Sequence, residues 1–240
     1  MAAFAKLLTT ELKTTLRDGP TSLVAVVFPT VVVALFGMIT DPAAGTDPLR
    51  FFYQPMSLSM GVGVLAFSLM ATELATYREK GILRRMAVTP VRPYRLLGAQ
   101  LVINLAIAAA SVVSVIAVGT LGFGFPLPRQ APAFLVTIAL SLAALLGIGL
   151  FIAAVAPTAR AATTIGVACY FGNLVLGGIF LPKEQMPDTL ARIGDFMPLG
   201  AMLQALRDAW SGHWPQAVSL AVLAACASLF GALAVRLFRW

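Results

Sequence analysis

Long stretches without a charged residue dominate the chain. Six of them contain no Asp, Glu, Lys or Arg: 19–40, 51–72, 96–128, 130–159, 161–182 and 209–235. A membrane-spanning helix needs about 20 mainly apolar residues, because lipid offers no hydrogen bonds and a helix satisfies its own backbone. The pattern therefore predicts an all-α polytopic membrane protein with six transmembrane helices, at about 19–40, 51–76, 96–121, 133–155, 161–182 and 212–236. Residues 1–240 are expected to form one transmembrane domain.

Two segments outside these spans have helical signals of their own. In residues 1–18 the apolar side chains recur every fourth position, and the basic side chains fall on the opposite side of the helical wheel: Phe4, Leu8, Leu12 and Leu16 against Lys6, Lys13 and Arg17. This predicts an amphipathic interfacial helix, with an ordinary cytosolic helix as the alternative. Segment 183–208 carries seven charges, Pro187 and Pro198. It predicts short outer helices that re-enter the membrane without crossing it.

Composition and charge agree with a bilayer protein and set its orientation. Hydrophobic residues make up 59% of the chain and charged residues 11%, and the mean hydropathy is +0.89, outside the range of soluble domains. The net charge of +7 reflects the positive-inside rule rather than nucleic-acid binding. With both termini cytosolic, the inner segments hold most of the basic residues: Lys6, Lys13, Arg17, Arg78, Lys80, Arg84, Arg85, Arg92, Arg95, Arg160, Arg236 and Arg239.

Several residues within or beside the spans have structural explanations. The two cysteines, Cys169 and Cys226, lie in predicted spans and are expected to be small buried residues without a disulfide. Trp210 and Trp214 are expected to be aromatic anchors at the outer interface. Glycine pairs in the spans indicate close helix packing or a subunit contact, or only the general tolerance of glycine there. They are Gly61 and Gly63, Gly147 and Gly149, and Gly177 and Gly178.

Catalytic candidates are few, and no metal site is predicted. Glu73 lies near the inner end of the second span, where it either snorkels or pairs with Arg78, or acts as a gating carboxylate. The single histidine, His213, has no companion at metal-ligand spacing. No lysine follows a glycine, so the chain lacks the Gly-Lys-Ser/Thr of a phosphate-binding P-loop. Catalysis within the chain is therefore poorly supported, and we do not expect an enzyme.

The basic loop 77–95 carries a different signal. Between Gly81 and Pro90 there is room for about two helical turns, with Ile82, Leu83 and Met86 apolar. Such an element is suited to docking on a cytosolic partner while its arginines bind carboxylates. The alternative is an anchor on lipid headgroups.

This loop resembles the coupling helix of permeases of type-2 ABC transporters, the bacterial drug, lipid and polysaccharide exporters. The resemblance is to an acidic-basic-Gly-x-Leu-x-Arg-Leu-x-x-Thr-Pro run after span two, in which Ile82 and Met86 are mild departures. It implies that the following residues couple to an ATPase subunit: Arg78, Glu79, Lys80, Gly81, Leu83, Arg84, Arg85, Met86, Thr89 and Pro90.

A second resemblance lies after span five. The run Gly177 to Pro182, followed by Met186-Pro187 and Pro198-Leu199, looks like the outer re-entrant signature of the same family. It implies an outer gate that includes Gly178, Phe180, Pro182, Pro187, Pro198, Leu199 and Arg207.

Together the two resemblances imply a permease of the bacterial plasma (inner) membrane that pairs with a second permease, identical or different, and with two ATPase subunits. ATP and Mg are expected on the ATPase, with no cofactor on this chain. The expected substrate is a hydrophobic or amphiphilic drug or lipid-like compound, on a path lined by spans two and five. A lipid-linked polysaccharide is the alternative substrate, and an ion-coupled secondary transporter or a membrane anchor is the alternative class.

Overall fold

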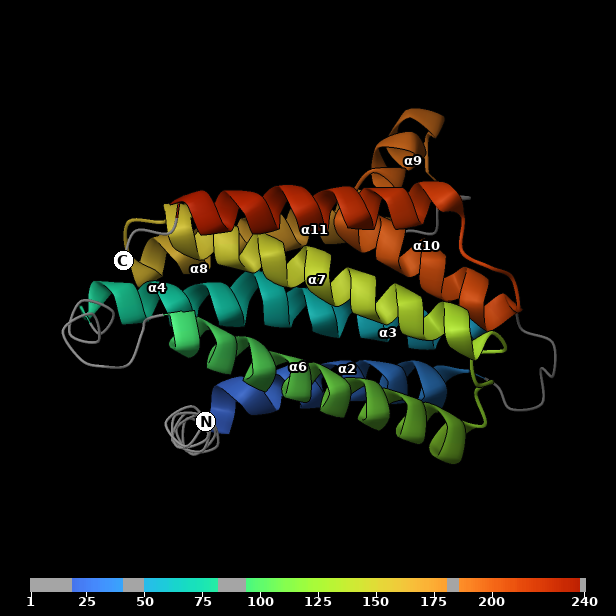
Figure 1. Ribbon diagram of the computed structural model, residues 1–240. Helices are drawn as coiled ribbons and strands as arrows, with labels where there is room; N and C mark the ends of the chain where they lie inside the picture. The colour runs from blue at the N-terminus through green and yellow to red at the C-terminus, as the bar shows by residue number, and fades with distance from the viewer. Residues whose placement is uncertain (1–18, 41–49, 82–93, 181–185, 238–240) are drawn as a thin grey trace.

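The computed structural model describes residues 19–40, 50–81, 94–180 and 186–237, and these consist of helices and turns without a strand (Figure 1). The α-helices are α2 (Gly19–Ile39), α3 (Arg50–Val64), α4 (Ala71–Glu79), α6 (Tyr94–Ala117), α7 (Ala131–Val155), α8 (Ala159–Leu176), α9 (Asp188–Asp195), α10 (Pro198–Ser211) and α11 (Ala217–Leu237). Two π-helical segments, η1 (Leu65–Met70) and η2 (Val118–Gly122), continue α3 and α6. The predicted all-α class is confirmed, whereas the expected interfacial helix at 1–18 lies outside the described residues.

The long helices run along one bundle and alternate in direction (Figure 1). At one end, called the α4 end, α4 and α7 finish and α6 and α8 begin. Helix α2 also begins at this end, and α11 finishes there. At the opposite end α3, α7 and α11 begin and α10 finishes. The start of α2 and the end of α11 thus lie at the same end of the bundle, and the cytosolic placement of the two termini stays a prediction.

Among the described residues, four helices are long and apolar enough to cross a membrane. They are Phe51–Glu79, Gly98–Gly122, Ala131–Val155 and Ala217–Leu237, and Leu23–Ile39 is a shorter apolar helix. The count of six spans therefore stays a prediction. Some bounds differ from the expected ones: the second span continues through Glu79, and α8 ends at Leu176 instead of 182.

The second span is the central helix of the bundle. Within Phe51–Glu79, 72% of the most apolar stretch is buried, against 28% for Gly98–Gly122 and 17% for Ala217–Leu237. Its large side chains Leu65, Phe67 and Met70 are almost fully enclosed. It packs against α2, α6, α7, α8 and α10.

Glycines on two neighbouring helices allow them to approach the π-helical segment η1 closely. A Cβ atom on Gly149 of α7 would overlap the carbonyl oxygen of Ala66, and one on Gly166 of α8 would overlap that of Phe67. Small residues at such contacts let helix backbones pack closely in membranes. The π-helical backbone of the central helix is therefore held between α7 and α8.

The expectation that Trp210 is an interfacial anchor is wrong. Its side chain has no exposed area and lies on α10, which packs against α3, α7 and α11. Its indole Nε1 donates hydrogen bonds to the carbonyl oxygen of Pro126 at 2.8 Å and to Oε1 of Gln54 at 3.1 Å. By contrast, Trp214 is 56% exposed. Cys169 is also exposed rather than buried, and both thiols are free.

Candidate functional site

The predicted gating carboxylate, Glu73, lies in the first turn of α4, directly after η1. Glu73 is half-buried. The neighbouring Thr72 shares a hydrogen bond of 2.9 Å between its hydroxyl and that of Thr163 on α8. Glu73 thus sits where the π-helical segment gives way to the part of the central helix that is tied to α8. Its gating role stays a prediction.

Two charged residues at the end of α4 bond to backbone atoms on either side of the connection between α7 and α8. Nη1 of Arg78 donates to the carbonyl oxygen of Ala154 at 2.6 Å, and Oε2 of Glu79 accepts from the backbone N–H of Ala159 at 2.7 Å. The last carbonyl groups and the first N–H groups of a helix lack partners within the helix. The helix dipole favours a cation at the carbonyl end and an anion at the N–H end. Arg78 and Glu79 satisfy both helix ends at once. We call these two bonds the α4 latch.

The chain turns away directly after the latch. Lys80 is exposed, and its backbone N–H bonds to the carbonyl oxygen of Thr76 at 2.9 Å. Gly81 has a φ of 66°, a left-handed conformation that favours glycine and ends the helix. The other expected coupling residues, Leu83, Arg84, Arg85, Met86, Thr89 and Pro90, lie outside the described residues. The structure thus places Arg78 and Glu79 beside the α7–α8 connection, and Lys80 and Gly81 follow them directly along the chain.

Sequence reasoning did not identify the residues that receive the latch. Ala154 and Ala159 take part through backbone atoms, which carry no side-chain signature. A weaker signal was present at Thr158, whose hydroxyl accepts from the backbone N–H of Ala161 at 3.1 Å and caps α8. Threonine before a helical stretch is a common N-cap, so the sequence could have indicated the start of α8. It could not have indicated that Glu79 binds there.

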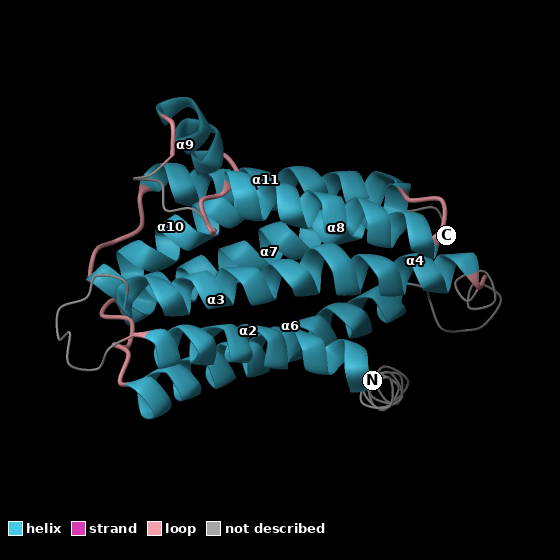
Figure 2. Cartoon of the chain, turned by 180° about the vertical axis from the view of Figure 1, so that it is seen from behind, coloured by secondary structure: helices cyan, strands magenta, loops and turns pink. Residues whose placement is uncertain are grey.

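Three glycines bring the end of α8 together with α9 and α10. A Cβ atom on Gly177 would crowd the backbone of Gly200, one on Gly194 would overlap the carbonyl oxygen of Leu176, and one on Gly200 would overlap that of Gly194. Helix α9 projects from the bundle while α10 returns into it (Figure 2). These short helices lie where the outer segment 183–208 is expected, and their re-entry into a membrane stays a prediction.

The residues of the expected outer gate have varied environments. Gly178 is buried with a φ of 76°, and Leu199 is fully buried, whereas Phe180 is 57% exposed. Pro187 directly precedes α9, and Pro198 is the first residue of α10. The guanidinium of Arg207 lies 5.2 Å from the centre of the Phe52 ring, in cation–π range. Pro182 lies outside the described residues.

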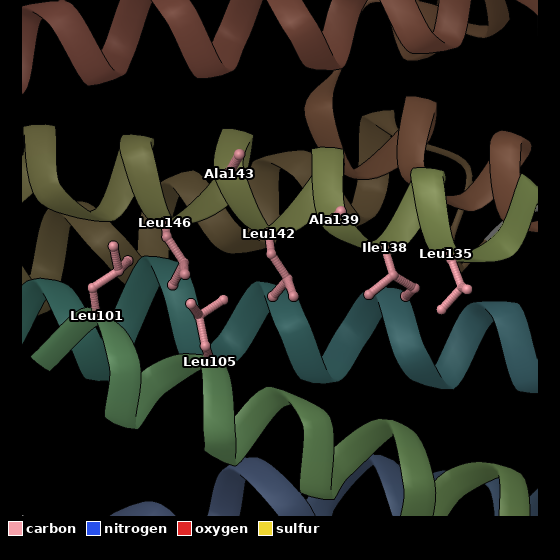
Figure 3. A pocket seen from close by; sticks show the side chains of 8 residues that line it. All are labelled: Leu101, Leu105, Leu135, Ile138, Ala139, Leu142, Ala143 and Leu146. Atoms are coloured by element: carbon pink, nitrogen blue, oxygen red, sulfur yellow. The ribbon is translucent and has the colours of Figure 1, made fainter. Parts of the chain in front are cut away.

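A purely aliphatic groove separates α6 from α7 (Figure 3). Its volume is about 480 Å³, within the range of small-molecule pockets. Leu101 and Leu105 reach into it from α6 toward Leu142 and Leu146 of α7. The remaining lining residues are Leu135, Ile138, Ala139 and Ala143. With no polar side chain in its lining, the groove suits a hydrocarbon group and offers no ligand to a metal ion.

The methionines of the central helix do not line this groove. Met56, Met60 and Met70 are all buried in the hydrophobic core of the bundle. Their position supports a packing role. The groove lies between the third and fourth predicted spans, whereas the substrate path was expected along the second and fifth.

Comparison with known proteins places these features in a family. The sequence profile of the family described as ABC-2 type transporter matches residues 2–210. The chain is also similar to the inner membrane transport permease YhhJ of Escherichia coli (strain K12) and of Shigella flexneri. Each is 26% identical over 181 residues, which cover 72% of this chain and 48% of the relative. The chain thus matches about half the length of these curated relatives.

Proposed function

The chain belongs to the ABC-2 type transporter family, and we propose that it is the permease subunit of an ATP-driven exporter of hydrophobic or amphiphilic compounds. With its several long apolar helices it is a multi-pass inner-membrane protein. The exported compound, drug or lipid-like, leaves the cytosol or the inner leaflet. Family membership is the observation that carries this proposal.

The proposed complex contains a second permease, identical or different, and two ATPase subunits. ATP and Mg bind to the ATPase, which supplies the hydrolysis. This chain has no Gly-Lys-Ser/Thr sequence with which to hold ATP phosphates in a P-loop. Its own contribution is a set of helices whose rearrangement opens a path, driven by an ATPase bound at the basic loop 77–95.

The groove between α6 and α7 supports an apolar substrate class. All eight of its lining residues are aliphatic, so binding there gains from burial of hydrocarbon and not from hydrogen bonds. A sugar would leave its hydroxyl groups without partners at this surface. The groove therefore fits the hydrocarbon chain of a membrane lipid or of a lipid-like compound, and the choice of an apolar substrate stays part of the proposal.

Filling the groove is expected to weaken binding of hydrocarbon. In the variant Ala139→Phe the added ring occupies the groove. Labelling by a photoactivatable phospholipid should then fall about tenfold, because several methylene groups of the lipid chain can no longer be buried there. The measurement is labelling of the purified complex in lipid vesicles, mapped by peptide mass spectrometry.

The matched control for this variant is Val113→Phe, because Val113 is 66% exposed on α6 and does not line the groove. Its labelling should equal that of the wild type. Equal labelling of the Ala139→Phe variant would show that the groove does not hold the lipid chain.

Transport by the purified complex tests the proposal as a whole. The chain is purified with its associated ATPase, placed in proteoliposomes and assayed for ATP-dependent movement of the lipophilic dye Hoechst 33342 and of a fluorescent phospholipid. Export of a lipid-linked glycan alone would favour the polysaccharide alternative. Transport driven by a proton gradient without nucleotide would reject the ATP-driven mechanism.

Reversing the charges of the basic loop is expected to separate ATP hydrolysis from transport. Arg84→Glu with Arg85→Glu removes the cations proposed to bind ATPase carboxylates, and transport per ATP should fall at least about tenfold. Insertion should be unaffected, as judged by yield and gel filtration. The control is Arg236→Glu, an exposed basic residue in the last turn of α11 at the same end of the bundle. Unchanged coupling in the double variant would reject the docking role.

A further inference from the structure

The α4 latch consists of two charged side chains that bind backbone atoms of distant parts of the chain. Arg78 reaches the carbonyl oxygen of Ala154 at 2.6 Å, and Glu79 reaches the N–H of Ala159 at 2.7 Å. Both are hydrogen bonds to an ionised group, which are shorter and stronger than neutral ones. The acceptor, the carbonyl of Ala154, lies at the end of α7, and the donor, the N–H of Ala159, lies at the start of α8. The latch therefore holds both helices.

A third bond ties α4 to α8 further along. The hydroxyls of Thr72 on α4 and Thr163 on α8 lie 2.9 Å apart. Helix α4 is short, from Ala71 to Glu79, and it begins where η1 ends. Since it is fastened to α8 at both ends, α4 and the start of α8 form one unit. The π-helical segment η1 separates that unit from α3.

The unit adjoins the segment to which the ATPase is proposed to bind. Only Lys80 and Gly81 lie between Glu79 and residue 82. At its other end, α8 meets the three glycines Gly177, Gly194 and Gly200, where α9 ends and α10 begins. Helix α8 therefore links the α4 latch directly to the segment expected to form the outer gate.

From this arrangement we infer that Arg78 and Glu79 act on the permease itself, as positioning residues that pass movement of the ATPase-bound segment to α7 and α8. The inference rests on the proposed function. It assigns a role within the permease to two residues that were expected to couple to the ATPase. A displacement of the chain at Gly81 moves the end of α4, and the latch carries α7 and α8 with it. Without the latch, only the Thr72–Thr163 bond and side-chain packing join α4 to α8, so the same displacement moves α8 less.

Substitutions at Glu79 test this inference, because one keeps the hydrogen bond and another removes it. In Glu79→Gln the amide oxygen still accepts from the N–H of Ala159, whereas Glu79→Ala leaves that N–H without its side-chain acceptor. The control is Arg160→Ala, which removes an exposed charge one residue further along α8. All variants are purified as the complex with the ATPase in proteoliposomes.

Three readouts are compared. In Glu79→Ala, transport of Hoechst 33342 per ATP hydrolysed should fall about fivefold, at the lower end of typical coupling strengths. Amide hydrogen exchange in the peptide that contains Ala159 should accelerate by a similar factor. The amount of ATPase that co-purifies should not change. Glu79→Gln and Arg160→Ala should stay close to the wild type in all three.

Specific results would overturn the inference. Loss of ATPase co-purification in Glu79→Ala would make Glu79 a docking residue, and an equal loss of coupling in Glu79→Gln would show that its charge and not its hydrogen bond matters. Unchanged coupling in Glu79→Ala would leave the latch without a role. If Glu79→Ala gives little folded protein, Glu79→Asp carries the same test, since its shorter side chain withdraws the carboxylate from Ala159. A wild-type complex without ATP-driven transport would reject the proposed function, while hydrogen exchange still tests the latch.

Discussion

Replacing Trp210 with alanine is expected to lower the free energy of unfolding by about 3–5 kcal/mol, the usual cost of removing a large aromatic side chain from a packed core. Trp210 has no exposed area, and its ring meets that of Phe134 edge to face at 5.3 Å between centroids. The indole also gives hydrogen bonds to Gln54 and Pro126. The loss of stability should appear as a large drop in the melting temperature of the detergent-solubilised protein. The melting temperature is measured by gel filtration of samples heated to increasing temperatures.

Two further variants separate the contributions. Trp210→Phe keeps an aromatic ring but removes the N–H donor, which should cost about 1–3 kcal/mol because the buried oxygen of Gln54 and the half-buried carbonyl of Pro126 lose their partner. Trp214→Ala is the control, because Trp214 is 56% exposed and should change stability little. Equal effects of the alanine variants at 210 and 214 would contradict the buried position of Trp210.

The sequence could not distinguish these two tryptophans, for a physical reason. Both stand near the polar residues that follow α10, and a tryptophan beside polar residues at the end of an apolar stretch is typical of a membrane interface. The depth of α10 in the bundle depends instead on distant contacts. Helix α10 begins at the meeting of Gly177, Gly194 and Gly200, and its length then brings Trp210 to Gln54 on α3.

The general architecture, in contrast, was predictable from local pattern. Charge-free stretches of span length identify apolar helices, since the bilayer requires every backbone group to be satisfied within the segment. The breaks within 183–208 also follow from local chemistry: Pro187 and Pro198 each stand directly before or at the start of a short helix. Helix bounds that depend on glycine conformation, such as the end of α8 before Gly178, were placed less accurately.

At the candidate site, the sequence identified the charged residues but not their partners. Arg78 and Glu79 stand out within a run that resembles a coupling motif. Their partners are backbone atoms 76 and 80 positions further along the chain. No side-chain type marks such atoms, so only the folded arrangement of α4, α7 and α8 reveals the latch.

Alanine at Gly149 or Gly166 is expected to disrupt the packing around the central helix, at a cost of about 3 kcal/mol, the upper end of the usual range for overpacking. The added Cβ would overlap the carbonyl oxygen of Ala66 in the first case and of Phe67 in the second. Those oxygens belong to the backbone of η1, which cannot rotate away as a flexible side chain does. The measurement is the yield of monodisperse protein in detergent and its melting temperature.

The same substitution on the same helices provides the controls. A Cβ on Gly147 of α7 meets only ordinary contacts at 3.4 Å or more, and one on Gly172 of α8 meets nothing within 4 Å. Alanine at these positions should be neutral or slightly stabilising, because alanine favours helix by up to about 1 kcal/mol over glycine. The sequence left open whether glycines in the spans mark close packing or mere tolerance. A large loss of stability at 149 and 166, with none at 147 and 172, would assign close packing to the first pair and mere tolerance to the second. Equal effects at all four positions would show that α7 and α8 do not hold η1 between them.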